Sequence, residues 1–152
     1  MKIEYKQMDA SGLDAIKLLW EKQRDHHQSV STYFSHSFEN ITFQHRTEEL
    51  RRKSENGKLD IYIAHDSELG RDIGYVVSSI EADNTGEIDS IYIEDKYRGS
   101  GIGKVLMEHG LQWLRENNAV DIKIVVAHGN DSVLKFYQQF GFYPKSYVLL
   151  EK

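Results

Sequence analysis

A glycine-rich stretch with a cation at each end most constrains what this chain can fold into. The stretch runs from Arg98 to Lys104 as Arg-Gly-Ser-Gly-Ile-Gly-Lys, between an apolar strand-like run and a long amphipathic helix pattern. Glycine lets the backbone adopt positive φ and lets a ligand approach the main chain closely. The helix that begins here presents unpaired N–H groups and the positive end of its dipole. The stretch therefore predicts an anion cradle suited to a phosphate or pyrophosphate.

The composition limits the classes of protein that this chain can form. Its 152 residues predict one domain, covering residues 1–152, with a substantial core. The chain has no cysteine, which excludes disulfides, thiolate zinc sites and a cysteine nucleophile. A formal charge of −5 argues against general nucleic-acid binding, which favours a basic surface.

No segment predicts export or membrane insertion. Residues 1–6 alternate apolar and charged side chains, unlike a signal peptide. No apolar run approaches the ~20 residues that a bilayer span needs. We therefore expect a cytoplasmic protein with neither a nucleic-acid nor a membrane partner.

The first third of the chain predicts a strand followed by helices. Residues 2–8 alternate as a strand does. A helix is expected from a capping box at Ser11, fading near His26. A second helix fits the apolar spacing within 34–41, and a third is expected over about 47–56.

The remainder predicts an α/β order. The expected elements are strands over 60–66, 72–81 and 86–94, a helix to about Asn117, a strand over 120–127, a helix over 130–140 and a last strand over 145–151. Tight turns join the first three of these strands, which makes them antiparallel. The sequence therefore predicts an α/β (α+β) domain with a mixed, mostly antiparallel sheet flanked by helices.

The strand over 86–94 changes its alternation. Ile88 is apolar, but the next apolar positions are Ile91 and Ile93. An inserted bulge residue produces such a shift and re-aims the side chains beside it. The alternative is a regular strand buried on both faces, in which Ser90 is a tolerated polar residue.

A dinucleotide-binding fingerprint is the competing interpretation of the glycines, since they follow a strand and open a helix. The stretch lies about two thirds along the chain, which leaves too few residues for the second half of a doubly wound fold. The preceding strands are antiparallel, whereas that fold needs parallel strands joined by helices. We therefore reject this interpretation.

Further motifs accompany the glycine stretch. The pattern Arg/Gln-x-x-Gly-x-Gly/Ala is met by Arg98, Gly101 and Gly103, and the pattern Asn-x6-Tyr-x3-Gly-Phe by Asn130, Tyr137, Gly141 and Phe142. Together with Ile91-Tyr92-Ile93, these motifs resemble the GNAT superfamily of acetyl-CoA-dependent N-acetyltransferases over residues 86–142. The resemblance implies a sheet splayed in the middle to admit acetyl-CoA as co-substrate. It also implies acetyl transfer to a primary amine by direct attack in a ternary complex.

The resemblance assigns a role to each motif. Backbone N–H groups of residues 99–104 would hold the CoA pyrophosphate, and residues 91–93 would pair with the pantetheine arm. Asn130 would contact the pantetheine and is also a good N-cap. Tyr137 would donate a proton to the departing thiolate, which suits a phenol of pKa about 10. The implied binding residues are Ile91, Tyr92, Ile93, Arg98, Gly99, Ser100, Gly101, Ile102, Gly103, Lys104, Asn130 and Tyr137.

Several groups are candidates for the general base. Glu87 lies where some protein-acetylating members of the family carry a glutamate, and a bulge can aim Asp89 into the cleft. His128 is a third candidate, and a water relay is an alternative to all three. Ordinary roles also stay open: Lys104 as a solvated surface lysine and Tyr137 as a boundary tyrosine.

The acceptor site is expected against the helices that follow the first strand. Its candidate lining residues are Trp20, His26, His27, Tyr33, Phe34 and Phe38, of which Trp20 and Phe38 suit the core better. Only about ten residues follow Phe142, too few for the usual two long strands. We therefore expect a site that is open to a small-molecule or peptide amine, or completed by a second subunit in a homodimer. No metal site is expected, and the alternative to an enzyme is a non-catalytic CoA-binding or sensing module.

Overall fold

A five-stranded sheet in the order β1-β2-β3-β4-β5 forms the centre of the molecule. The computed structural model describes residues 1–152, and its strands are β1 (Ile3–Met8), β2 (Lys58–Asp66), β3 (Arg71–Ile80), β4 (Thr85–Ile93) and β5 (Val120–Ile124). The first four strands pair antiparallel, and β4 pairs parallel with β5. The predicted mixed, mostly antiparallel sheet is confirmed.

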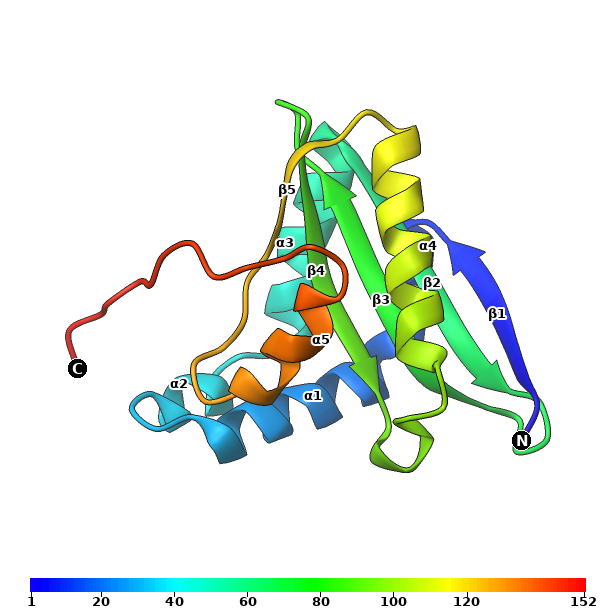
Figure 1. Ribbon diagram of the computed structural model, residues 1–152, viewed down its shortest axis with the longest axis horizontal. Helices are drawn as coiled ribbons and strands as arrows, with labels where there is room; N and C mark the ends of the chain where they lie inside the picture. The colour runs from blue at the N-terminus through cyan, green and yellow to red at the C-terminus, as the bar shows by residue number, and fades with distance from the viewer.

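Helices cover both faces of the sheet (Figure 1). One face carries η1 (Ala10–Ile16), α1 (Lys17–Val30) and α3 (Phe43–Asn56), and the other carries α4 (Ile102–Glu116) and α5 (Leu134–Gln138). The short α2 (Ser35–Glu39) lies beside α1, while the single turns η2 (Asp95–Tyr97) and η3 (Asp131–Val133) precede α4 and α5. None of the helices combines the length and the apolar character that a membrane span requires.

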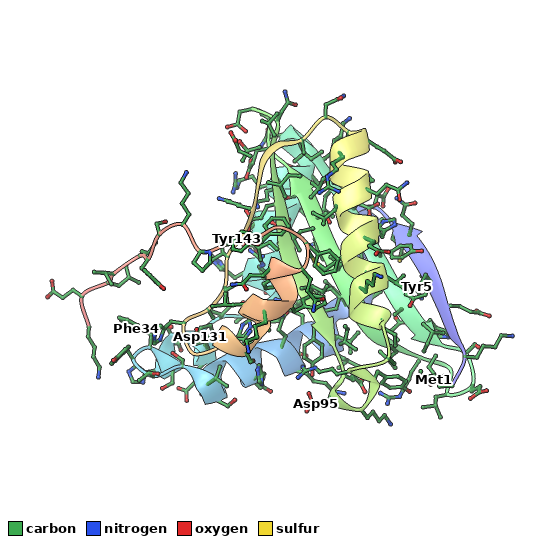
Figure 2. All side chains as sticks on the ribbon, viewed as in Figure 1. Met1, Tyr5, Phe34, Asp95, Asp131 and Tyr143 are labelled. Atoms are coloured by element: carbon green, nitrogen blue, oxygen red, sulfur yellow. The ribbon has the colours of Figure 1, made fainter.

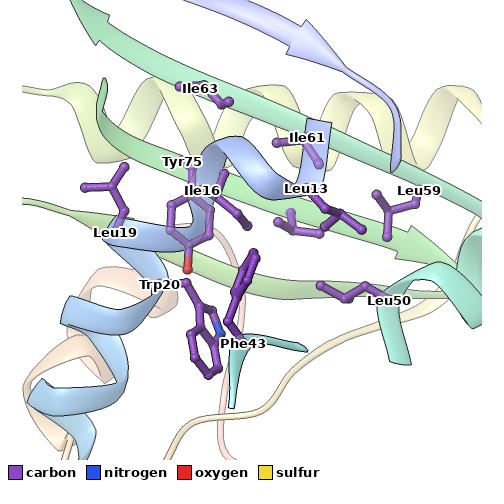
Figure 3. Packing of buried hydrophobic residues seen from close by; sticks show 11 residues of the cluster. Leu13, Ile16, Leu19, Trp20, Phe43, Leu50, Leu59, Ile61, Ile63 and Tyr75 are labelled. Atoms are coloured by element: carbon purple, nitrogen blue, oxygen red, sulfur yellow. The ribbon is translucent and has the colours of Figure 1, made fainter. Parts of the chain in front are cut away.

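The central strand β3 supplies side chains to two separate cores. Tyr75 and Val77 pack with η1, α1 and α3, whereas Val76 between them packs with α4. Figure 3 shows the first core, in which Leu13 and Phe43 gather with Tyr75 against the sheet. Alternate side chains of a strand point to opposite faces, so a strand between two helix layers is apolar on both.

Two helices begin at caps that the sequence analysis did not identify. Asp9, not Ser11, caps the first helical segment, since its carboxylate accepts from the Ser11 N–H at 2.9 Å. The Thr42 hydroxyl accepts from the His45 N–H at 3.1 Å, so α3 begins at Phe43, four residues earlier than predicted. Capping groups, rather than the apolar stripe, set where these helices begin.

Three predictions of extent are wrong. The strand predicted over 120–127 ends at Ile124. Helix α1 continues to Val30 rather than fading near His26. The last strand predicted over 145–151 is absent, and Tyr147 and Leu149 within it are 82% and 91% exposed. Alternating apolar residues give a segment strand propensity, but a strand also needs a neighbour to accept its hydrogen bonds, and this segment has none.

The bulge predicted in β4 is confirmed. Ile88 and Ser90 lie opposite consecutive residues of β3, Ser78 and Val77, so Asp89 is the inserted residue. Beyond the bulge β4 stays paired with β3, but its pairing with β5 ends at Ile88. The second half of β4 therefore has an open edge.

Candidate active site

The open edge of β4 presents main-chain groups of Ile91 and Ile93. The Glu94 N–H donates to the Ile73 carbonyl of β3 at 2.9 Å. In an antiparallel pair, the N–H and C=O groups of every second residue point toward the partner strand, so those of Tyr92 also point toward β3. The N–H and C=O groups of Ile91 and Ile93 therefore face the gap that opens where β5 diverges.

Side-chain donors form hydrogen bonds with both carbonyls on this edge. Gln23 Nε2 donates to the Ile91 carbonyl at 2.9 Å, and Arg98 Nε donates to the Ile93 carbonyl at 3.0 Å. Past Ile88 no strand lies beside the edge to accept from the N–H groups. The edge thus offers donors, which suits a ligand that carries carbonyl oxygens.

The glycine-rich stretch forms the turn into α4. Gly99 and Gly101 have φ values of +79° and +87°, which favour glycine. No atom stands within 4 Å of where a Cβ of either residue would lie, so the turn is open on its outer side. The N–H groups in the first turn of α4 lack intrahelical partners. This geometry fits the predicted pyrophosphate cradle.

Gly103 has a packing role instead. A Cβ at this position would lie 3.0 Å from Ile93 Cδ1 and 3.3 Å from the Phe136 ring. Glycine here lets α4, β4 and α5 approach closely. The start of α4 is thereby held beside the open edge of β4.

The two cations at the ends of the glycine stretch differ in their surroundings. The Arg98 guanidinium pairs with Asp95 at 3.0 Å and lies 5.6 Å from the centroid of the Tyr92 ring. The Lys104 side chain is 70% exposed, with Glu108 at 3.8 Å. Arg98 is tied to the end of β4, whereas Lys104 projects from the start of α4.

Tyr137 lies on α5, at the boundary of the second core. It packs there with Phe136 and Phe140. Burial raises the pKa of the Tyr137 hydroxyl to about 12. The hydroxyl therefore stays protonated at neutral pH, as a proton donor requires.

The α1 region that was expected to line the acceptor site lies against the loop after β5, which carries Asn130 and His128. Asn130 Oδ1 is 3.4 Å from His26 Nε2, and its side chain makes no capping hydrogen bond. The rings of Tyr33 and His128 stack with their centroids 5.7 Å apart. Figure 2 shows this loop, at Asp131, lying over α1. The turn after α1 and the loop after β5 thus face each other.

The other predicted lining residues are more buried. Trp20 belongs to the first core, with its ring 5.5 Å from that of Phe43. His27 lies against the half-buried Phe38 at 5.8 Å between ring centroids, and burial lowers the pKa of His27. Phe34 is half-buried just before α2. Trp20 therefore has the core role that was favoured for it, whereas the same expectation for Phe38 is wrong, since Phe38 belongs to neither core.

Lys53, which the sequence analysis did not single out, forms ion pairs with the carboxylates of both Glu87 and Asp89. Lys53 Nζ lies 2.6 Å from Asp89 Oδ1 and 3.1 Å from Glu87 Oε1. Burial by itself would lower the pKa of Lys53, but the two carboxylates outweigh it and raise that pKa. The sequence signal was its place on the buried stripe of α3, three residues after Leu50.

The two carboxylates differ in access. The Asp89 side chain is 0% exposed, and burial raises its pKa despite the nearby lysine. Arg46 also donates to the Asp89 carbonyl at 3.0 Å, so the bulge is anchored from α3 twice. The Glu87 side chain keeps 16% exposure and lies 3.7 Å from Lys123. A base role for either residue stays a prediction, and Glu87 is the more accessible of the two.

A splayed sheet with a glycine turn at the start of its long helix is the architecture that the sequence motifs led us to expect of an acetyltransferase. The model of the Acetyltransferase (GNAT) family matches residues 15–142 of this chain. The chain belongs to this family.

Curated relatives are similar over part of their length. An uncharacterized N-acetyltransferase of Methanocaldococcus jannaschii is 27% identical over 85 residues, which are 52% of this chain and 38% of that protein. A mycothiol acetyltransferase of Thermomonospora curvata is 30% identical over 73 residues, which are 48% of this chain and 25% of that protein. The chain thus matches less than half of the length of these relatives.

Solved structures match nearly the whole chain. A GCN5-related N-acetyltransferase from Ralstonia eutropha superposes with a TM-score of 0.75 at 13% identity, over 99% of both chains. The PaiA N-acetyltransferase from Thermoplasma acidophilum, solved in complex with coenzyme A, has a TM-score of 0.72 at 19% identity, over 95% of this chain and 92% of that chain. These structures share the fold.

Proposed function

We propose that this protein transfers the acetyl group of acetyl-CoA to a primary amine. Membership of the acetyltransferase family supports acetyl transfer. The observation that carries the choice of co-substrate is the donor-bearing edge of β4 beside an open helix N-terminus. A long ligand with carbonyl groups at one end and a pyrophosphate at the other matches both features.

The chain's own groups suggest how the co-substrate would be held. Main-chain N–H groups of residues 99–104 would bind the pyrophosphate, with added charge from Arg98 and Lys104. The N–H groups of Ile91 and Ile93 would pair with carbonyl oxygens of the acyl-pantetheine arm, as a sheet edge pairs with an added strand. The structure of PaiA with coenzyme A lends support from a protein of the same fold.

When bound, acetyl-CoA supplies a thioester whose carbonyl carbon bonds to the amine nitrogen while its C–S bond breaks. The Ile91 N–H would stabilise the negative charge that develops on the carbonyl oxygen. Tyr137 would give its proton to the sulfur. The amine loses one proton before attack, which Glu87, His128 or a water relay would accept, and one afterwards, which would replace the proton that Tyr137 gave to the sulfur. The absence of cysteine accords with direct attack.

The acceptor would approach beside the place where α1 meets the loop after β5, near His26 and Asn130. Tyr143 and Val148, in the segment after α5, are exposed. We propose a small-molecule or peptide amine as acceptor, in a site that is open or completed by a second copy in a homodimer. The acidic net charge gives no reason to propose a nucleic-acid partner.

A second candidate function is a non-catalytic CoA-binding or sensing module. The observation in its favour is that Lys53 pairs with both Glu87 and Asp89, which leaves neither carboxylate unpaired as a base. Calorimetric titration with coenzyme A and acetyl-CoA, followed by thiol release with an amine panel, separates the two functions. Binding with turnover supports the enzyme, and tight binding without turnover on any amine supports the module. Absence of binding to either ligand contradicts both.

A further inference from the structure

Gln23 links three parts of the molecule at the point where the edge of β4 opens. Its side chain leaves the middle of α1 and reaches the carbonyl of Ile91, which lies 68 residues away in sequence. Its other end, Oε1, lies 2.7 Å from the Tyr75 hydroxyl and 2.8 Å from Ser90 Oγ. Ser90 and Ile91 are the first two residues after the bulge.

The chemistry of these contacts fixes the orientation of the Gln23 amide. A backbone carbonyl only accepts hydrogen bonds, so the amide NH2 must face Ile91. The amide oxygen then faces two hydroxyl groups, which can donate to it. Tyr75 is completely buried, and burial raises the pKa of its hydroxyl far above its usual value, so the hydroxyl stays a neutral donor.

The same contacts fix the direction of the Ile91 N–H. This group lies in the peptide between Ser90 and Ile91, and Gln23 holds the Ser90 hydroxyl on one side of it and the Ile91 carbonyl on the other. The Gln23 donor also partly neutralises that carbonyl. Without it, the negative end of a carbonyl dipole would face the place where negative charge develops.

We propose that Gln23 is a positioning residue, which aims the Ile91 N–H at the acetyl carbonyl of the co-substrate and keeps the Ile91 carbonyl from opposing it. The inference rests on the proposed function, since it concerns the same site. It assigns Gln23 no contact with the acetyl group and no proton transfer. Its effect on rate comes through the orientation of a preorganised donor.

The decisive variant is Gln23→Glu, which keeps an oxygen for Tyr75 and Ser90 but replaces the donor that faces Ile91 with a second oxygen. We expect kcat to fall by about tenfold to a hundredfold, since small misplacements of a catalytic donor have effects of this size. The affinity for coenzyme A, which lacks the acetyl carbonyl, should change by less than about threefold, or 0.7 kcal/mol. Acetyl-CoA should lose any affinity advantage that it has over coenzyme A.

A readout independent of activity is the amide resonance of Ile91. In the wild-type protein this resonance should move on addition of acetyl-CoA beyond its movement with coenzyme A. In Gln23→Glu the two ligands should move it equally. Ser90→Ala, which removes one anchor and leaves the Ile91 contact, should change kcat and the resonance in the same direction but less. This variant also serves if Gln23→Glu does not fold.

Gln112→Met provides the control, because Gln112 is an exposed residue of α4 whose side chain donates a hydrogen bond to Glu116 on the same helix. It should behave as the wild type in every measurement. Wild-type kcat and a wild-type Ile91 resonance in both Gln23→Glu and Ser90→Ala would overturn the inference and leave the proposed function intact. A wild-type protein that binds no coenzyme A would overturn both.

Discussion

The Lys53 ammonium lies 2.6 Å from the carboxylate of Asp89, the residue that the bulge inserts into β4. The pair joins the last turn of α3 to the point where β4 leaves β5. Its buried charges have no bulk water to solvate them, so each depends on the other. The bend that opens the candidate active site is therefore held by an ion pair.

Replacing Lys53 with methionine should destabilise the protein. The change leaves the Asp89 charge buried without its partner, for which a loss of about 3–5 kcal/mol in unfolding free energy at pH 7 is expected. The loss should shrink as the pH falls, since a protonated Asp89 needs no counter-charge. Urea unfolding at several pH values measures both effects.

The double variant Lys53→Met/Asp89→Asn should recover part of this stability, because it removes both charges. Arg52→Met is the matched control: Arg52 is the exposed neighbour on α3, and its loss should cost less than about 0.5 kcal/mol. Equal stability of Lys53→Met and the wild type at pH 7 would show that the pair does not hold the bulge.

Gly101→Ala should impair both folding and coenzyme A binding. An alanine at φ +87° costs about 1–2 kcal/mol, although the surrounding space is open. The methyl group and any shift in φ would also disturb the N–H groups at the start of α4. Calorimetry should show coenzyme A affinity reduced by about tenfold or more, which is 1.4 kcal/mol.

Gly70→Ala separates these two effects. Gly70 has φ +67° and equally open surroundings, but it lies in the turn between β2 and β3. The Gly70→Ala variant should lose about as much stability as Gly101→Ala but keep the wild-type affinity for coenzyme A. If both alanine variants bind coenzyme A like the wild type, the cradle assignment fails.

Tyr137→Phe should lower kcat by about a hundredfold, within the usual range for loss of a general acid, while acetyl-CoA affinity stays nearly unchanged. Because burial raises the Tyr137 pKa to about 12, its proton is lost only as the pH rises through that value. The wild-type rate should therefore show no Tyr137-dependent fall between about pH 7 and pH 10.

Tyr143→Phe is the control for this change, since Tyr143 lies on the exposed C-terminal segment (Figure 2) and is 72% exposed. Steady-state kinetics on an accepted amine, with calorimetry for acetyl-CoA, gives both quantities. A Tyr137→Phe enzyme with wild-type kcat would remove this residue from the mechanism.

The ion pairs of Glu94 should make the free energy of unfolding fall at acid pH. Burial favours a higher pKa for its carboxyl, but hydrogen bonds from Lys22 at 3.0 Å and Arg71 at 2.7 Å outweigh burial and hold that pKa below its ordinary value of 4.5. A lowered pKa means that the ionised form stabilises the fold above about pH 4.5, and that this contribution is lost as the pH falls through the folded-state value. Glu94→Gln should cost about 2 kcal/mol at pH 7 and less near pH 3.

Asp14→Asn is the comparison for Glu94→Gln. The Asp14 carboxylate is 86% exposed and lies 3.6 Å from Arg51. Its loss should change stability by less than about 0.5 kcal/mol at either pH, because solvent screens exposed pairs. A pH-independent difference between Glu94→Gln and the wild type would contradict the assigned role of Glu94.

Sequence predictions that rest on neighbouring residues were correct more often than those that depend on residues far away in the chain. The Asp89 bulge was visible because it shifts the apolar alternation of its own strand. The strand over 145–151 was predicted from alternation too, yet it is absent, because pairing depends on a neighbour that alternation does not report. The cap at Asp9 was missed because several polar residues compete at a helix start.

The candidate site divides in the same way. Gly99, Gly101 and Gly103 were identified from a local motif, whose backbone and packing demands act over a few residues. Lys53 and Gln23 were not identified, since their contacts to β4 span 36 and 68 residues. A buried lysine on a helix stripe resembles many amphipathic surface lysines until its partner strand is known.

By itself the sequence determined the order of strands and helices as far as α5, the bulge and the glycine turn at the start of α4, because periodicity and backbone freedom are local properties. Only the tertiary structure decided which side chains anchor the bulge, which carbonyls on the open edge of β4 are capped, and which candidate carboxylates are accessible. Those outcomes depend on how α1 and α3 pack against the sheet. The spacing of residues along the chain does not specify which side chains meet across such a packed interface.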